Sequence, residues 1–298
     1  MIFTYKIGLD SYNGRGDVNG GLYEYKLIKK EVDFVAKALQ FKCNNKKALI
    51  LVGGYLKKES EIKVIEKLLN VYFDVKIFIA TDYVSISTCK DIINKCDYLL
   101  TQTTQKIEDG ISKEVKQLYS GVPELFYKYI RYKLVKKVNQ DNKIIFGGAN
   151  TGRQDLFERY EINEKNDNYC LFTKINESGY DNRIGYFDFI EQLQYHKYTV
   201  VISRDVYRDV GWVTPRYYEA LAANCLPFID SEYDKNMIYN LPYWLTTQSY
   251  RDIMFLRDKY DKNERLRKAR LAELKESASR RTLIFSDLLI KIINEEVL

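Results

Sequence analysis

The densest group of residues that could do chemistry lies between Ser203 and Leu221 of this 298-residue chain. Within it, Arg216 and Glu219 stand three residues apart, so on a helix their side chains share one face. A guanidinium group binds phosphate through paired hydrogen bonds, and a carboxylate accepts hydrogen bonds from two vicinal hydroxyl groups. The pair could therefore hold the diphosphate and the ribose of a nucleotide sugar, or it could be an ordinary exposed ion pair.

Two other segments offer groups for anion binding and proton transfer. The segment FGGANTGR contains Gly147 and Gly148, where bare backbone lets N–H groups approach an anion, and Arg153, which adds a positive charge. A purely structural turn is the alternative for these glycines. Asp82 follows the apolar run 75–80 (VKIFIA), where its carboxylate could act as a general base or could cap the next helix.

The elements that must position these residues alternate between strands and helices. Short apolar runs predict strands at 47–52, 75–80, 98–100, 143–146, 169–173, 198–203 and 225–229. Apolar spacing and helix-forming composition predict helices at 55–70, 187–194, about 215–223, 251–275 and 279–293. Such alternation predicts parallel sheets covered on both faces, with ligands bound beyond the carboxyl ends of the strands.

The chain is expected to form two lobes. Each half contains a strand that runs into glycines, at Gly53 and at Gly147, and a basic aromatic stretch, 121–138, lies between the halves. We expect an N-terminal Rossmann-like lobe over residues 1–140 and a C-terminal one over 141–298, with the final helix packing back on the first lobe. The predicted architecture is an α/β fold with two Rossmann-like lobes facing a central cleft.

Composition limits the class of protein. With 47 Lys+Arg, 41 Asp+Glu and 46% hydrophobic residues, the chain is globular and mildly basic, and its net charge is +6. Five cysteines without a CxxC pair or a Cys/His cluster, and the lack of a DxD sequence, argue against a disulfide framework and a metal site. No apolar run reaches about 18 residues, so we expect a soluble protein with no membrane partner. His196, in QYHKY, is expected at the surface end of a helix.

Three stretches together resemble the DNA β-glucosyltransferase family of T-even bacteriophages, whose members have the GT-B fold. They are IFIATDY, IIFGGANTGRQ and VISRDVYRDVGWVTPRYYEALAANCLPFIDSEYD, and they occur in the family's order along the chain. Asp205, Arg216 and Glu219 reproduce the family's spacing without a gap, whereas Tyr207 lies one place earlier than the family's tyrosine. The resemblance covers the second half of the chain well and the first half more loosely.

The resemblance implies an activity. It implies an inverting glycosyltransferase that moves a sugar, expected to be glucose, from a UDP-sugar to the hydroxyl of a 5-hydroxymethyl pyrimidine in phage DNA. Asp82 would be the catalytic base on the acceptor side, in the N-terminal lobe, and the C-terminal lobe would bind the donor. The donor-binding residues that the resemblance implies are Gly20, Gly21, Gly147, Gly148, Arg153, Asp205, Tyr207, Arg216 and Glu219.

The resemblance also implies partners and a location. The expected partners are the UDP-sugar, as co-substrate, and double-stranded DNA containing modified pyrimidines, with no tightly bound cofactor. A divalent metal ion stays an open alternative, for which the sequence offers no ligand motif. We expect a monomer in the cytoplasm of an infected bacterial host cell. The chain departs from the family in two places: it offers Arg153 where the family has two arginines, and Glu24 lies a turn beyond the family's carboxylate near the donor sugar.

Two other functions are compatible with the same nucleotide-binding site. A GT-B glycosyltransferase acting on a glycan or a small molecule would use the same donor half. A nucleotide-binding protein without turnover would not need Asp82. The acceptor could be hydroxymethylcytosine or hydroxymethyluracil, and the sequence leaves this choice open.

Overall fold

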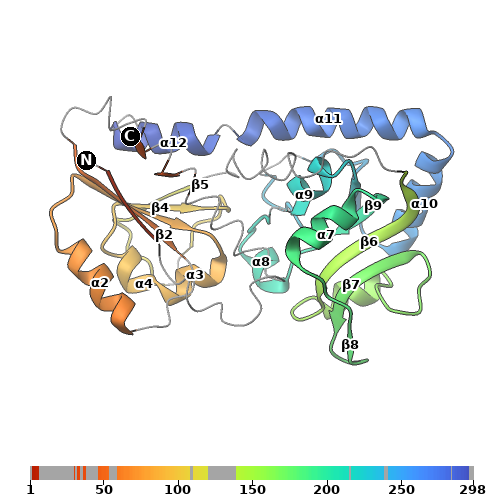
Figure 1. The fold of residues 1–298 in the computed structure, drawn as a ribbon, viewed down its shortest axis with the longest axis horizontal. Helices are drawn as coiled ribbons and strands as arrows, with labels where there is room; N and C mark the ends of the chain where they lie inside the picture. Colours follow the sequence, from red (N-terminus) through yellow and green to blue (C-terminus); the bar gives the residue numbers. More distant parts are fainter. Residues whose placement is uncertain are drawn as a thin grey trace. The chain divides into compact units, whose positions relative to one another are not determined.

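The chain forms two compact α/β units. The computed structural model describes residues 2–6, 30, 32–33, 36–37, 46–53, 59–107, 110–119, 139–214, 216–237, 241–282 and 284–294. Unit 1 comprises Met1–Phe126 together with Arg281–Leu298, and unit 2 comprises Tyr127–Arg280 (Figure 1). The C-terminal segment therefore belongs to unit 1 rather than to the lobe in which its sequence position puts it.

Unit 1 is built on a parallel sheet. Its strands, in the order β1-β2-β3-β4-β5, are β1 (Ile2–Lys6), β2 (Ala48–Gly53), β3 (Val75–Ala80), β4 (Tyr98–Thr101) and β5 (Lys116–Tyr119). Its described helices are α2 (Glu59–Leu69), α3 (Tyr83–Thr88), α4 (Lys90–Ile93) and α12 (Ile284–Ile293). Every residue of β2 is buried, as its unbroken apolar run predicts for a central parallel strand.

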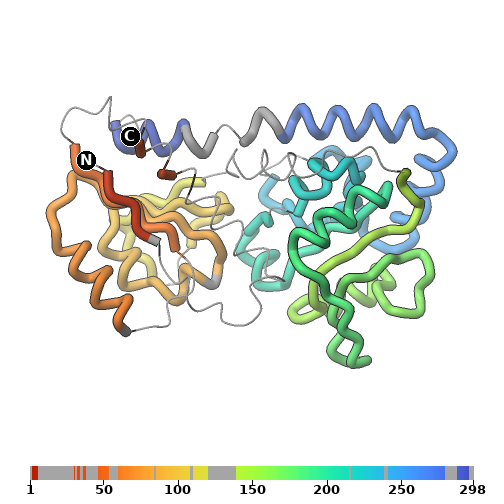
Figure 2. The backbone as a smooth tube through the Cα atoms, viewed as in Figure 1, coloured from red at the N-terminus to blue at the C-terminus, as the bar shows by residue number. Residues whose placement is uncertain are grey.

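The C-terminal helix completes the core of unit 1. Leu289, Ile292 and Ile293 of α12 are buried in one cluster with the strand residues Ile50 and Ile77. In Figure 2 the blue α12 segment lies beside the red and orange strands of this unit. An isolated helix of this length is marginal in water, so packing against the sheet supplies most of its stability.

Unit 2 contains a six-stranded, doubly wound sheet. Its strands, in the order β11-β10-β9-β6-β7-β8, are β6 (Asp141–Ala149), β7 (Tyr169–Ile175), β8 (Tyr180–Asp181), β9 (His196–Val201), β10 (Leu226–Asp230) and β11 (Thr246–Thr247). Its described helices are α6 (Gln154–Arg159), α7 (Tyr186–Leu193), α8 (Asp205–Asp209), α9 (Arg216–Ala222), α10 (Tyr250–Asp261) and α11 (Glu264–Thr282). Strand β8 is antiparallel to β7, and the other strand pairs are parallel.

The strand order of unit 2 reverses direction between β6 and β9. The chain adds β7 on one side of β6 and then returns to add β9 on the other side. In doubly wound sheets, ligands bind beyond the carboxyl ends of the strands at such a switch point. The connections that follow β6 and β9 are therefore the place in this unit to look for a binding site.

Two helix and strand boundaries differ from the sequence prediction. Strand β6 continues through Gly147 and Gly148 to Ala149, because both glycines pair in register with β7, so they are strand residues rather than a turn. The long charged helix expected after residue 250 is divided at Asn263. The side chain of Asn263 accepts the Leu266 N–H at 3.0 Å and so caps the start of α11.

His196 also differs from the prediction. It opens β9 and is buried, and its Nδ1 lies 2.6 Å from Oδ1 of Asp141 at the start of the neighbouring strand. The strand thus begins earlier than its apolar run suggests, because the imidazole finds a carboxylate partner. Among the described residues, no helix is both long enough and apolar enough to cross a membrane.

Candidate functional site

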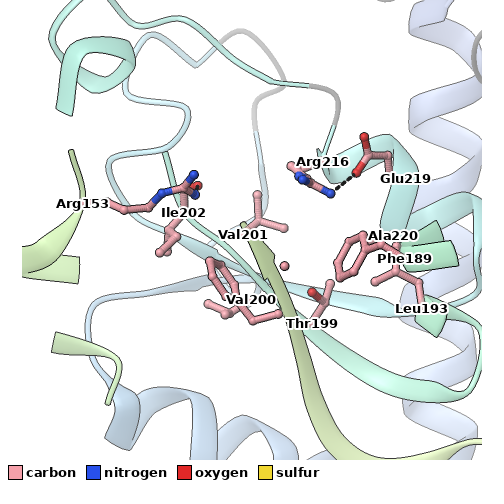
Figure 3. A pocket seen from close by; sticks show the side chains of 12 residues that line it. Arg153, Phe189, Leu193, Thr199, Val200, Val201, Ile202, Arg216, Glu219 and Ala220 are labelled. Atoms are coloured by element: carbon pink, nitrogen blue, oxygen red, sulfur yellow. Dashed lines mark hydrogen bonds and ion pairs between the residues drawn. The ribbon is translucent and has the colours of Figure 1, made fainter. Parts of the chain in front are cut away.

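A pocket lies at the switch point of the unit 2 sheet (Figure 3). Its walls come from the carboxyl ends of β6 and β9 and from helices α7 and α9. The lining residues are Phe146, Gly147, Arg153, Phe189, Leu193, Thr199, Val200, Val201, Ile202, Arg216, Glu219 and Ala220. Arg153, Arg216 and Glu219 carry charge in an otherwise mostly apolar lining. Two segments far apart in the sequence, FGGANTGR and TPRYYEAL, therefore meet at one site.

The two glycines of β6 let other groups come close to the strand. A Cβ atom on Gly147 would lie 2.4 Å from the Phe189 ring, so any side chain there would displace that ring. Gly148 has a φ of +135°, a backbone conformation that residues with a side chain rarely adopt. A Cβ atom there would lie 3.4 Å from Nη2 of Arg153. The glycines thus shape the pocket by admitting Phe189 and Arg153.

Glu219 is the buried acid of the pocket, with only 2% of its surface exposed. Its Oε2 accepts a hydrogen bond from Nη1 of Arg216 at 2.8 Å, and its Oε1 accepts one from the Tyr186 hydroxyl at 2.8 Å. Burial acts to lower the pKa of Arg216, but the charge and hydrogen bond of Glu219, together with Tyr186 and Tyr233, outweigh burial, so the pKa is raised. The pair is therefore anchored inside the pocket wall and is not an ordinary exposed ion pair.

Arg216 is held from a second direction by an aromatic ring. Its guanidinium carbon lies 5.0 Å from the centroid of the Phe189 ring, within the range of a cation–π contact. Phe189 is itself fixed by the close approach of Gly147. The β6 glycine, the α7 ring and the α9 arginine thus form one packed stack beside Glu219.

Arg153 lies on the side of the pocket away from Glu219 (Figure 3). Its Nη1 donates to the Ile202 carbonyl at 3.3 Å, and within the described part of the chain its buried Nε has no acceptor. Burial first, and then the charges of Arg204 and Arg216, lower the pKa of Arg153. A bound anion would supply both the missing acceptor and the missing negative charge.

Asp205 and Tyr207 lie on α8 and are not among the lining residues. The Asp205 N–H donates to the Gly152 carbonyl at 2.7 Å, and its Oδ1 accepts the Val206 N–H at 2.7 Å. Asp205 thus joins the connection after β9 to the connection after β6. Tyr207 is close enough to act electrostatically on Arg153. It acts to raise the pKa of the Arg153 guanidinium, whereas burial acts to lower it.

Asp82 lies in unit 1, between the carboxyl end of β3 and the start of α3. Its carbonyl accepts the N–H of Ser85 at 3.1 Å and the Ser85 hydroxyl at 2.5 Å, as expected for the residue before a helix. A half-exposed carboxylate at the end of a parallel strand suits proton transfer as well as capping. Gly20 and Gly21 lie outside the described residues.

Sequence reasoning missed three residues that the structure brings to this region. Tyr186 and Phe189 begin α7, and in a chain with 26 Tyr and 14 Phe they resembled any other core aromatic residue. Arg204 directly follows the strand predicted at 198–203, and that position was the signal that could have found it. All three become informative only through their neighbours in space.

Metal ligands do not gather in the part of the chain that the structure describes. No three His, Cys, Asp or Glu side chains there come close enough together to hold an ion. The pocket itself offers a single carboxylate, Glu219, already bonded to Arg216 and Tyr186. These residues do not fit a divalent cation held by protein ligands alone, which needs several oxygen donors.

The fold is that of the GT-B glycosyltransferases. A structure of the DNA-modifying enzyme β-glucosyltransferase, studied with and without its substrate uridine diphosphoglucose, matches with a TM-score of 0.58 and 16% identity, over 98% of this chain and 99% of that one. T4 phage BGT in complex with UDP and Mn²⁺ matches with a TM-score of 0.54 and 15% identity, over 98% and 99% of the two chains.

A second type of enzyme shares the fold. A trehalose-6-phosphate synthase structure, from E. coli and bound with UDP-2-fluoro glucose, matches with a TM-score of 0.51 and 10% identity, over 91% of this chain and 78% of that one. No family model and no curated protein matches the sequence. The likeness is therefore one of fold, and the site residues must carry the argument about function.

Proposed function

We propose that this protein is an inverting glycosyltransferase that moves a sugar from a UDP-sugar to the hydroxyl of a 5-hydroxymethyl pyrimidine in DNA, with glucose as the expected sugar. The observation that carries the proposal is the meeting of Arg153, Arg216 and Glu219 at the switch point of the unit 2 sheet. The match of fold to a β-glucosyltransferase whose substrate is uridine diphosphoglucose, over 98% of the chain, supports the same choice.

The donor would bind with its diphosphate against Arg153 and Arg216. A guanidinium group has five N–H donors, and Arg216 uses Nη1 for Glu219, so further N–H groups are available for phosphate oxygens. As the bond between the sugar and the diphosphate breaks, negative charge grows on the leaving UDP. Fixed positive charges at that place lower the energy of the transition state.

Glu219 would fix the ribose of the donor. Each carboxylate oxygen has two lone-pair sites, and Oε1 and Oε2 each use one, for Tyr186 and Arg216 respectively. The remaining sites can accept hydrogen bonds from two vicinal ribose hydroxyls. Because Glu219 is already held in position, little conformational freedom is lost when the nucleotide binds.

Asp82 would act as the general base. Its carboxylate takes the proton of the hydroxymethyl group while the hydroxyl oxygen attacks the anomeric carbon of the sugar. The bond from that carbon to the diphosphate breaks, UDP leaves with the electron pair, and the configuration at the carbon inverts. We assign the base and the acceptor to unit 1 and the donor to unit 2.

The proposed acceptor is a modified pyrimidine within duplex DNA. A hydroxymethyl group on a base inside a duplex reaches an enzyme's base only if the nucleotide is turned out of the stack, which costs a few kcal/mol. Contacts to phosphates can supply that energy, and a net charge of +6 favours them. A glycan or small-molecule acceptor would not need this charge.

The proposal is tested by measuring UDP release from a panel of UDP-sugars in the presence of different acceptors. The acceptors are hydroxymethylated duplex DNA, unmodified duplex DNA, and a set of glycans and small sugars. We expect release only with the hydroxymethylated duplex, and fastest from UDP-glucose. Release that depends on a glycan or small sugar would favour the alternative acceptor, and UDP binding without release under any condition would favour a non-catalytic protein.

A further inference from the structure

Arg204 lies directly against the connection that carries Arg153. Two residues before it, the Ile202 carbonyl accepts a hydrogen bond from Nη1 of Arg153 at 3.3 Å. Directly after it, the N–H of Asp205 donates a hydrogen bond to the Gly152 carbonyl at 2.7 Å. The backbone of Arg204 is therefore fixed beside Arg153, at the carboxyl end of β9.

The two connections are braced so that they cannot easily move apart. Asp155 on α6 receives two hydrogen bonds from Arg208 on α8, at 3.0 and 3.2 Å. Gly152 has a φ of +68°, and a Cβ atom there would lie 2.7 Å from Oδ1 of Asp205, so the two backbones fit together only without a side chain. The position of Arg204 relative to Arg153 is thus built into the fold.

Arg204 differs from its neighbouring arginines in having no counter-charge among the residues that the structure describes. Arg208 is paired with Asp155, and Arg159 lies within 3.6 Å of Asp230. Within the described part of the chain, the half-buried side chain of Arg204 has neither an ion pair nor a hydrogen bond. After burial, its charge has the largest effect in lowering the pKa of Arg153. Two like charges are therefore held close together without a carboxylate between them.

Arg204 is not among the residues that line the pocket, but its backbone is held beside Arg153, and neither arginine has an ion pair within the described part of the chain. Two such arginines can bind a multiply charged anion. We infer that Arg204 is a further donor-binding residue, which holds the pyrophosphate group together with Arg153 and Arg216. This inference rests on the proposed function for the identity of the nucleotide, but its anion chemistry does not depend on sugar transfer. It makes the site selective for a diphosphate over a monophosphate.

The test is calorimetric binding of inorganic pyrophosphate, UDP and UMP to the parent protein and to three variants. Arg204→Gln removes the charge, Arg204→Lys keeps it, and Arg265→Gln removes an exposed arginine of α11 that lines no part of the pocket. We expect Arg204→Gln to lose about tenfold or more in affinity for pyrophosphate and UDP, and less for UMP. Arg204→Lys should recover part of the loss, and Arg265→Gln should bind like the parent.

Equal affinities of the parent and Arg204→Gln for pyrophosphate and UDP would overturn the inference, as would a parent protein that does not bind pyrophosphate. The outcomes also separate it from the proposed function. A loss of pyrophosphate binding in Arg204→Gln, in a protein that transfers no sugar, keeps the inference and rejects the function. Sugar transfer with an unchanged KM for the donor in Arg204→Gln keeps the function and rejects the inference.

Discussion

Replacement of Glu219 by alanine should weaken UDP binding by about tenfold to a hundredfold. The carboxylate is 2% exposed and makes two hydrogen bonds of 2.8 Å, so it is held in place before a donor arrives. A hydrogen bond to a charged group contributes about 1.5 to 3 kcal/mol, and about 1.4 kcal/mol corresponds to a factor of ten in affinity. The expected loss is that of at least one such bond to a ribose hydroxyl.

Isothermal titration calorimetry with UDP measures this ratio directly. Tyr186→Phe is the matched control, because it removes the other hydrogen bond to the same carboxylate but leaves the charge and Arg216 in place. We expect Tyr186→Phe to lower the free energy of unfolding by about 1 kcal/mol. Its UDP affinity should stay within about threefold of the parent, a difference of at most about 0.7 kcal/mol.

Two results would refute the reasoning about Glu219. Unchanged UDP affinity in a folded Glu219→Ala protein would remove this residue from the nucleotide site. An equal loss of affinity in Glu219→Ala and Tyr186→Phe would mean that the pocket depends on the packing of the α7 and α9 helices and not on a carboxylate facing the ribose.

Three further predictions concern the base, the glycine and the acceptor. Asp82→Asn should keep stability and UDP binding, because Asn also caps helices, while turnover in a UDP-release assay falls by about two to four orders of magnitude; near-parent turnover would leave Asp82 a structural role. Gly147→Ala should cost about 1 to 3 kcal/mol in chemical denaturation and weaken UDP binding, because its Cβ atom displaces Phe189 beneath Arg216. The control Gly179→Ala strains the backbone, because Gly179 has a φ of +71°, but its Cβ atom meets no other group, so UDP binding should stay unchanged. For binding to hydroxymethylated duplex DNA, measured by fluorescence anisotropy, the logarithm of the association constant should fall linearly with the logarithm of the salt concentration. Binding that is insensitive to salt would contradict phosphate contacts.

The sheets of both units could be predicted from sequence because buried parallel strands have a simple pattern. The run ALILVG is apolar at almost every position, and all six of its residues are buried in β2. The helix 216–222 was equally well marked by its composition. Prediction from local pattern fails where a contact with a distant residue matters. At His196, which contacts the carboxylate of Asp141, strand β9 begins two residues before its apolar run.

The candidate site could be predicted only in part. The spacing of Arg216 and Glu219 pointed to a shared helix face, and the structure adds that Tyr186 from another helix holds the same carboxylate. Nothing in the sequence says that Phe189 fills the space left by Gly147, because that contact joins residues far apart in the chain. The position of Arg204 after the predicted strand 198–203 is visible in the sequence, but the sequence does not show that this side chain has no partner among the described residues.

The most direct test of the central claim is mass spectrometry of the nucleosides obtained from a DNA duplex after incubation with the protein and UDP-glucose. We expect the 5-hydroxymethyl pyrimidine nucleoside to gain the mass of one hexose, and the same duplex without hydroxymethyl groups to stay unmodified. The Asp82→Asn protein, which should still bind UDP, serves as the negative control. Hydroxymethyl nucleosides that keep their original mass with every UDP-sugar, in the presence of a protein shown to bind UDP, would contradict the DNA acceptor.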